Sequence, residues 1–239
     1  LETVKFFSLF ADVMVLAREL TLQQVDSIVK GIEDENICGP SGQLIRIEIF
    51  AHGALCVAVS GKCYMSLHTY NSSANRGACL QNCRRSYIVT DKETGEELEI
   101  DNEFIMSPKD LCTIDFLDKV LDSGVTVLKL EGRARPPEYV YTVTKCYREA
   151  ADAVIKKEYT TEKIKKWKEE LGTVYNRGFW EGYYLGKKLG EWSGVYGSKA
   201  TKTKIYKGSV VNWYAQQKVA AVFLDAGDII VGDEILITG

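Results

Sequence analysis

Apolar segments that suit β-strands alternate with helical segments along much of this sequence. The apolar segments cover residues 12–17, 46–51, 104–107 and 125–130. A helix is predicted over 22–29 with Thr21 as its N-cap, over 114–122, and from Pro136-Pro137 to Ala150. Four apolar strands, each followed by a helix or an insertion, predict an α/β fold with a parallel sheet.

Polar residues follow these segments directly, which favours one kind of α/β fold. In a TIM-barrel-like (β/α) domain, active sites are built at the rim formed by the carboxyl ends of the strands. The residues predicted at this rim are Arg18, Glu19, His52, Ser107, Lys109, Glu131 and Arg133. Four strands do not close an eight-stranded barrel, so we expect the N-terminal strands to be absent from this sequence or supplied by a second chain.

Three regions are predicted along the chain. Residues 1–160 form the partial barrel, interrupted by a hairpin whose strands are 86–90 and 97–100. Residues 161–199 form a helical connector rich in aromatic side chains. Residues 200–239 form a small β-barrel-like domain, with strands predicted at 205–214, 219–224 and 234–237.

The overall composition is that of a globular protein. The 239 residues are 46% hydrophobic and 26% charged, which excludes disordered and low-complexity classes. No apolar run reaches the roughly 18–20 residues of a membrane span, and the first residues lack the layout of a signal peptide. We therefore expect a cytoplasmic protein without a membrane partner.

The seven cysteines are unevenly distributed, and five of them lie between positions 56 and 112. These five are Cys56, Cys63, Cys79, Cys83 and Cys112, with neighbouring glycines that let the backbone approach a bulky centre. Four thiolates suit either tetrahedral zinc or a [4Fe–4S] cluster, and the wide spacing favours iron. The alternative is a reduced set of buried structural cysteines, the role that we assign to Cys38 and Cys146.

Positive charge is concentrated in one part of an acidic chain. Residues 145–207 carry 15 lysines and arginines against 8 aspartates and glutamates, a balance of +7, within a net charge of −3. Such a segment suits an anionic partner such as RNA. The alternative is the solvated face of a helix. Trp180, Tyr183 and Tyr184 beside Arg177 likewise suit either base stacking or packing between domains.

Several motifs together resemble peptidase family U32, the collagenase-like peptidases. The strongest runs from His52-Gly-Ala-Leu-Cys56 to Cys83-Arg-Arg-Ser-Tyr87. The others lie at 15–20, 107–112, 130–133, 147–150 and 176–179, and the resemblance covers about residues 3–185.

This resemblance implies a barrel-like catalytic domain and a role away from proteolysis. Family members resemble tRNA hydroxylases that make 5-hydroxyuridine at the wobble position, with prephenate as a required metabolite. Relatives that act on ubiquinone precursors hold a [4Fe–4S] cluster by four cysteines. Carried over by position, these ligands are Cys56, Cys63, Cys79 and Cys112, with Cys83 as the alternative fourth ligand.

The predicted roles in RNA hydroxylation follow from side-chain chemistry. Glu19, His52 and Arg133 are the candidate catalytic residues, with Glu19 transferring a proton. The candidate substrate-binding residues are Arg18, Tyr87, Lys109, Glu131 and Arg177. Internal ion pairs are the alternative for Arg18-Glu19 and for Glu131-Arg133.

Two other functions stay open from the sequence. A collagenase-like peptidase would need a nucleophile with an oriented base, for which His52 beside Cys56 is the candidate pair. No His-Glu-x-x-His motif is present for a zinc peptidase. The third possibility is a non-catalytic, zinc-stabilised RNA-binding module.

Overall fold

A computed structural model describes residues 1–98, 104, 106–187 and 190–238 of the chain. Two compact units are present, Leu1–Thr201 and Lys202–Gly239. The predicted division into three regions stays a prediction.

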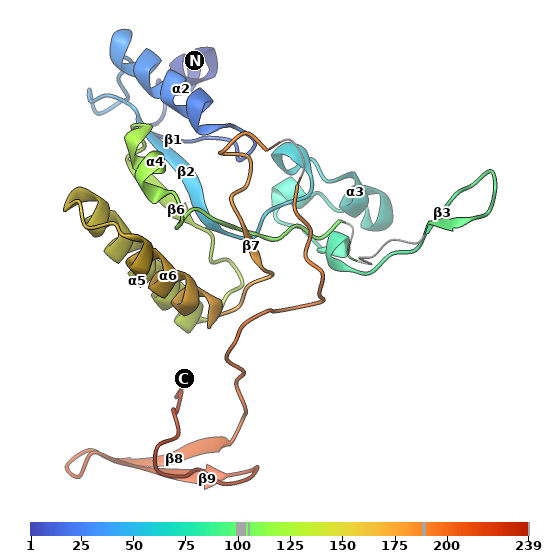
Figure 1. Cartoon of the computed structure of the whole chain (residues 1–239), viewed down its shortest axis with the longest axis vertical. Coiled ribbons are helices and arrows are strands. Elements are labelled where there is room, and N and C mark those ends of the chain that lie inside the picture. Colours follow the sequence, from blue (N-terminus) through green and yellow to red (C-terminus); the bar gives the residue numbers. More distant parts are fainter. Residues whose placement is uncertain (99–103, 105, 188–189, 239) are drawn as a thin grey trace. The chain divides into compact units, whose positions relative to one another are not determined.

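The first unit is built on an open mixed sheet, in which β2 (Arg46–Gly53) is the central strand (Figure 1). Its alternate residues Ile47, Ile49 and Ala51 are buried, as expected for a strand that turns one face to a core. The strands β1 (Val13–Val15) and β6 (Val127–Leu130) both pair with β2 in parallel. The α/β class is therefore confirmed.

The carboxyl end of β2 has a different neighbour. Strand β5 (Asp110–Cys112) runs antiparallel to it, with His52 opposite Cys112, and β7 (Phe179–Trp180) pairs with β5 in parallel. This sheet closes no barrel within the described ranges. The strand predicted over 104–107 is also not formed: Phe104 and Met106 lie in turns, and Ile105 is outside the described residues. Pro108, which has no N–H for a β-ladder, precedes the strand that does form.

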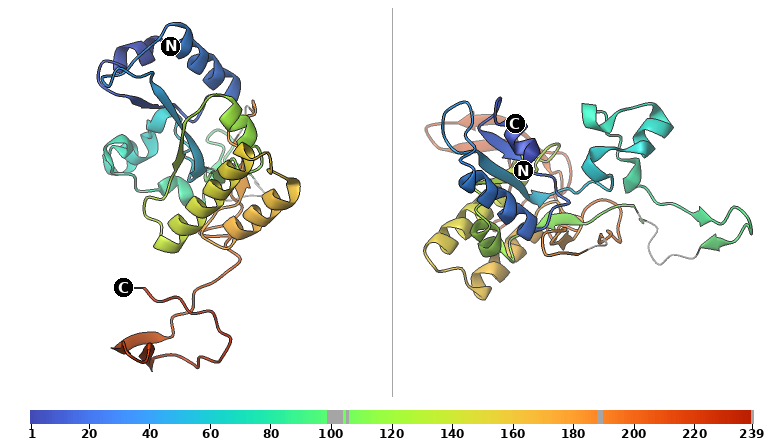
Figure 2. Two further views of the ribbon diagram at one scale, coloured as in Figure 1. Left: turned by 90° about the vertical axis from the view of Figure 1, so that its left-hand side faces the viewer. Right: turned by 90° about the horizontal axis from the view of Figure 1, so that it is seen from above.

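Four helices bury apolar side chains in the same core as the sheet. Figure 2 shows these helices beside the sheet. They are α2 (Leu22–Asp34), α4 (Leu117–Asp122), α5 (Pro137–Ile155) and α6 (Thr161–Gly172). Helices α2 and α5 extend past their predicted ends, α4 begins later than predicted, and α6 lies in the predicted helical connector. The Thr21 N-cap is confirmed, because its side chain and that of Gln24 form a capping box. A short helix that was not predicted, α1 (Glu2–Phe7), begins the chain.

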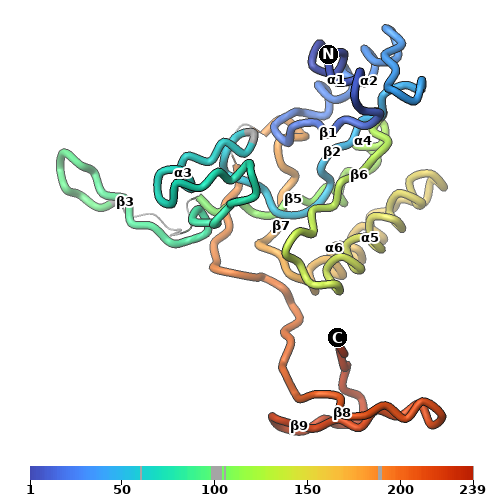
Figure 3. The backbone as a smooth tube through the Cα atoms, turned by 180° about the vertical axis from the view of Figure 1, so that it is seen from behind, coloured from blue at the N-terminus to red at the C-terminus, as the bar shows by residue number. Residues whose placement is uncertain are grey.

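An insertion leaves the carboxyl end of β2 and carries α3 (Tyr64–Tyr70) and three 3₁₀ turns (Figure 3). It continues into the predicted hairpin, whose strands are β3 (Val89–Thr90) and β4 (Glu97–Leu98). Residues 99 and 100, the end of the predicted second strand, lie outside the described residues.

The second unit is a single antiparallel hairpin of β8 (Gly208–Tyr214) and β9 (Val219–Leu224). The third strand predicted over 234–237 is not formed, and the described residues of this unit close no barrel. A two-stranded ribbon cannot enclose a core, and Trp213 and Phe223 are accordingly exposed. Across both units, none of the helices in the described ranges is long and apolar enough to span a membrane.

Candidate functional site

Four of the predicted metal ligands lie in one stretch, residues 56–85, which we call the cysteine segment. Its described side chains include no buried apolar residue, and only Ser66 and Asn82 are buried. Tyr64 and Leu67 on α3 are exposed instead. The hydrophobic effect therefore contributes little to holding this segment together.

Backbone and hydroxyl groups hydrogen-bond to two of the sulfur atoms. The N–H of Ala58 donates to Cys56 Sγ at 3.4 Å, and the N–H of Ser66 donates to Cys63 Sγ at 3.4 Å. Cys63 is the N-cap of α3. Burial opposes ionisation of Cys63, but bonds from Ser66 and the N–H of Met65 outweigh it and lower the pKa of this thiol. N–H groups directed at sulfur are typical of thiolate-bound metal centres.

The other thiols of the segment influence the pKa of Cys83. Burial raises the pKa of the Cys83 thiol, the adjacent Arg84 guanidinium opposes the rise, and the thiolates of Cys56, Cys79 and Cys63 add to it. These three sulfur atoms are therefore close enough to act on Cys83 electrostatically. Even so, no three His, Cys, Asp or Glu side chains in the described ranges are spaced to hold one metal ion.

Cys112 lies in a different environment. It is 3% exposed on β5, with its sulfur 3.8 Å from the Tyr147 hydroxyl, and burial raises its pKa to about 11. The thiolates that act on Cys83 are not among the main influences on Cys112. The donor chemistry of a four-thiolate site is thus best matched by Cys56, Cys63, Cys79 and Cys83, the predicted alternative set.

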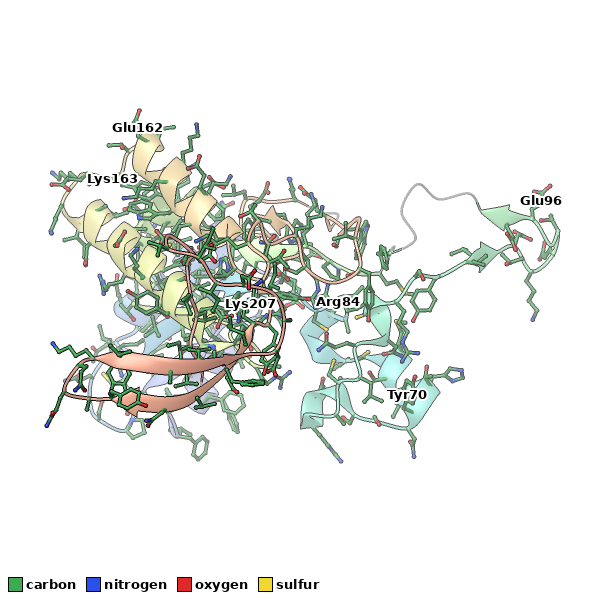
Figure 4. The ribbon with its side chains drawn as sticks, turned by 90° about the horizontal axis from the view of Figure 1, so that it is seen from below. Tyr70, Arg84, Glu96, Glu162, Lys163 and Lys207 are labelled. Carbon is green, nitrogen blue, oxygen red and sulfur yellow. The ribbon has the colours of Figure 1, made fainter. Side chains whose placement is uncertain are left out.

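Arg84, which the sequence analysis missed, joins the cysteine segment to the sheet (Figure 4). Its guanidinium donates to Leu55 O at 2.6 Å, Pro108 O at 2.5 Å and Ser107 Oγ at 3.0 Å. The signal was present in the sequence as an arginine next to a cysteine inside the strongest family motif.

The predicted catalytic residue His52 is buried in the core. It is 2% exposed and packs against Tyr139, Tyr147 and Phe179, with Nδ1 3.4 Å from the Tyr147 hydroxyl. Burial, and then the charge of Arg135, lower the pKa of His52 to about 3, so the imidazole is neutral. Because His52 does not reach a surface, this burial counts against contact with substrate.

Tyr147, also missed, is hydrogen-bonded to backbone groups of two strands' ends in this region. Its hydroxyl donates to Ala51 O and accepts the N–H of Thr113, both at 2.9 Å. One side chain from α5 thus satisfies backbone groups at the junction of β2 and β5.

Arg18 and Glu19 lie together beside the aromatic side chains of the first unit. Arg18 donates to Ala54 O at 2.8 Å, and its guanidinium carbon is 4.6 Å from the centroid of the Phe50 ring. Burial raises the pKa of Tyr184, with Arg18 opposing the rise and Glu19 adding to it. Both predicted residues are therefore near the Tyr184 hydroxyl.

Glu131 and Arg133 follow β6 as predicted. The carboxylate of Glu131 accepts the backbone N–H of Arg133 at 2.9 Å, and the Arg133 side chain is exposed. Gly53 is required here, because a Cβ at this position would lie 2.5 Å from Glu131 O, and its φ is +115°.

The remaining predicted residues have protein partners. Tyr87 donates to Asn82 O at 2.7 Å, and Lys109 pairs with Glu191 at 2.8 Å. Arg177 is 7% exposed and lies 3.5 Å from the carboxylate of Asp110. Trp180 and Tyr184 are buried, which agrees with packing rather than with an exposed stacking surface.

Much of the predicted basic stretch is neutralised locally. On and around α6, Lys145 pairs with Glu170, Lys163 with Glu158, and Lys168 with Asp115, each at 2.7–2.8 Å. These pairs favour the solvated-face interpretation for this helix.

The known proteins that are similar to this chain have two kinds of name, some of peptidases and some of RNA-hydroxylation proteins. The model of peptidase family U32 matches residues 1–194. The chain is 58% identical over its whole length to a collagenase of Porphyromonas gingivalis, covering 58% of that protein. It is 37% identical to an uncharacterized protease of Methanocaldococcus jannaschii, over 99% of the chain and 57% of that protein.

A third relative has an RNA-related name. The chain is 35% identical to tRNA hydroxylation protein P1 of Bacillus subtilis, over 84% of the chain and 46% of that protein. The chain therefore spans about half the length of these relatives. No solved structure matches.

Proposed function

Because the chain belongs to peptidase family U32, we propose that it is part of an enzyme that hydroxylates an RNA base and holds a metal centre by cysteine thiolates. The predicted substrate is a tRNA wobble uridine, converted to 5-hydroxyuridine. Three further points stay predictions: prephenate as a required metabolite, a second chain that completes the barrel, and a cytoplasmic location.

One observation carries this proposal. Backbone N–H groups of Ala58 and Ser66 are directed at the sulfur atoms of Cys56 and Cys63, in a segment whose described side chains include no buried apolar residue. A segment without an apolar core needs another source of order, and metal ligation by thiolates is the usual one in small loop-rich elements.

Cys56, Cys63, Cys79 and Cys83 would hold the centre. When bound, a [4Fe–4S] cluster would supply one-electron transfer, whereas zinc would supply structural order. The residues of this chain supply the surroundings. Ala58 and Ser66 donate hydrogen bonds to sulfur, and Arg84 fixes the segment to the loops at the end of β2 and before β5.

The test uses the full-length protein, purified without oxygen, and a strain that lacks its gene. We expect iron and sulfide in the protein, and loss of hydroxylated pyrimidine from the RNA of the strain, measured by mass spectrometry. Wild-type protein should restore the modification and the Cys83→Ser variant should not. Restoration by Cys83→Ser to the wild-type level would refute the proposed ligand set.

A collagenase-like peptidase is the second candidate, because a relative with that name is 58% identical over the whole chain. The geometry offers this function little support, since His52 is buried, neutral and directed at Tyr147. Gelatin cleavage that persists after metal removal and is lost in Cys56→Ser would favour the peptidase over the hydroxylase.

A further inference from the structure

Two arginines from separate loops converge on one aromatic ring. Arg135 lies between β6 and α5, and Arg177 lies between α6 and β7. Their guanidinium carbons are 3.9 Å and 5.0 Å from the centroid of the Tyr175 ring. An aromatic face stabilises a guanidinium group but does not neutralise its charge.

Positive charge exceeds negative charge around this ring. Among the described residues, the only ion pair formed by Arg84, Arg135 or Arg177 joins Arg177 to Asp110. The donors of Arg84 are used by uncharged oxygen atoms of Leu55, Ser107 and Pro108. Glu131, at the same strand end, accepts a backbone N–H from Arg133.

The position of this group within the sheet is that of a ligand site. Arg135 follows the carboxyl end of β6, and Arg177 lies two residues before β7, which runs opposite to β6, so that its amino end is at the same edge of the sheet. Ligands of open α/β sheets bind outside the carboxyl ends of the parallel strands. Arg177 and Asp110 are buried, whereas Arg135 and Tyr175 are only partly buried, so that solvent reaches the outer part of the group.

We propose that Arg135, Arg177 and Tyr175 form a binding site for an oxyanion, the carboxylate or phosphate group of a ligand. The planar guanidinium fork matches the two oxygen atoms of such a group, and the pairing is strongest where water is partly excluded. Asp110 holds Arg177 in place from the buried side. Arg135 supplies the accessible donors.

None of the three residues of this site is a proposed metal ligand, and Arg84, which adjoins Cys83, adds to the positive charge nearby without being one of the three. A carboxylate from a small organic acid and a phosphate from a nucleotide share the chemistry that it recognises. Separate binding measurements with a carboxylate and with phosphate distinguish these two sources.

The experiment is isothermal titration calorimetry of the metal-loaded, full-length protein with malonate and with inorganic phosphate, at an ionic strength fixed with sodium chloride. We expect saturable binding of at least one anion. Arg135→Gln should weaken that binding at least about tenfold, the effect of removing a charged hydrogen bond. Arg135→Lys, which keeps the charge and loses the fork, should have an intermediate affinity.

Arg148→Gln is the matched control, because Arg148 is an exposed arginine on α5 that pairs with Asp152. Its affinity should equal that of the wild type. Malonate binding alone would assign the site to carboxylates, and phosphate binding alone to phosphates. Absence of saturable binding of both anions, or equal affinities of Arg135→Gln and Arg148→Gln, would overturn the proposal. Metal content and thermal unfolding of the same samples report separately on the metal centre and on folding.

Discussion

Strand β2 and the cysteine segment adjoin in the sequence but differ in what holds them. In β2, Ile47, Ile49 and Ala51 are buried in a core shared with four helices. Each fully buried isoleucine contributes about 1.5–3 kcal/mol. In the cysteine segment, the described side chains provide no such contribution, and the buried residues Ser66 and Asn82 are polar.

This difference indicates that the two regions respond to different perturbations. The sheet is stabilised by a large apolar interior and should open only when the whole unit unfolds. The cysteine segment depends on a few specific interactions: the hydrogen bonds of Arg84, the bonds to sulfur and, as we propose, a metal. We expect each of these to be removable while the sheet stays folded.

Removing the metal is expected to have the largest effect. Chelation, or Cys83→Ser, should abolish amide protection in residues 56–85 and leave β2 protected, as measured by hydrogen exchange. If the ion is zinc, its removal takes away about 10–16 kcal/mol of apparent binding free energy. Cys38→Ser is the control, because Cys38 forms an isolated β-bridge with Leu44 and lies outside the cysteine segment. Equal protection of the cysteine segment with and without chelator would refute this difference between the regions.

The next largest effect is expected for Arg84→Gln. The variant loses charged hydrogen bonds to Leu55 O and Pro108 O, which should cost about 3 kcal/mol. The loss should appear as easier local opening of the cysteine segment in hydrogen exchange, with less retained metal. Arg85→Gln is the matched control, since Arg85 is exposed and only approaches the Tyr70 ring at 5.8 Å. Equal opening in the two variants would show that Arg84 does not anchor the segment.

The sequence predicted the sheet better than the site. Local patterns gave β2, α2 and α5 because burial periodicity and capping are encoded over a few neighbouring residues. The antiparallel pairing of β5 with β2 was not predicted, since strand direction depends on contacts between residues that are distant in the sequence. The strand predicted over 234–237 in the second unit is not formed, because an apolar segment forms a strand only when a neighbouring strand accepts and donates its backbone hydrogen bonds.

Within the site, residue types were predicted more accurately than their surroundings. The cysteines stood out by their spacing, but which of Cys83 and Cys112 joins the others depends on the path of the insertion. His52 follows the predicted strand, as a rim residue would, yet it lies within β2 and is buried under Tyr139, Tyr147 and Phe179. Nothing in the local sequence specifies that cover.

Tyr147→Phe should produce a smaller, global effect, in contrast to the local effect of Arg84→Gln. Without the hydroxyl, the N–H of Thr113 and the carbonyl of Ala51 keep only the 3.1 Å hydrogen bond between them. We expect the free energy of unfolding in urea to fall by about 1 kcal/mol. Tyr141→Phe, at an exposed position of the same helix, should change it by less than about 0.5 kcal/mol. Unchanged stability in Tyr147→Phe would show that this hydroxyl does not support the sheet.

The last expected effect is a dependence on pH that originates from His52. Its pKa is about 3 in the folded protein and about 6.5 in the unfolded chain. Between these values the unfolded state binds more protons, so stability falls as the pH drops below about 6.5, by at most about 1.4 kcal/mol per unit. His52→Gln should have a shallower slope than the wild type in urea unfolding between pH 6.5 and 4.5. A catalytic histidine exposed at the rim would have nearly the same pKa in both states, and the two slopes would then be equal. The slope therefore decides whether His52 belongs to the apolar interior of the sheet or to a surface that substrate can reach.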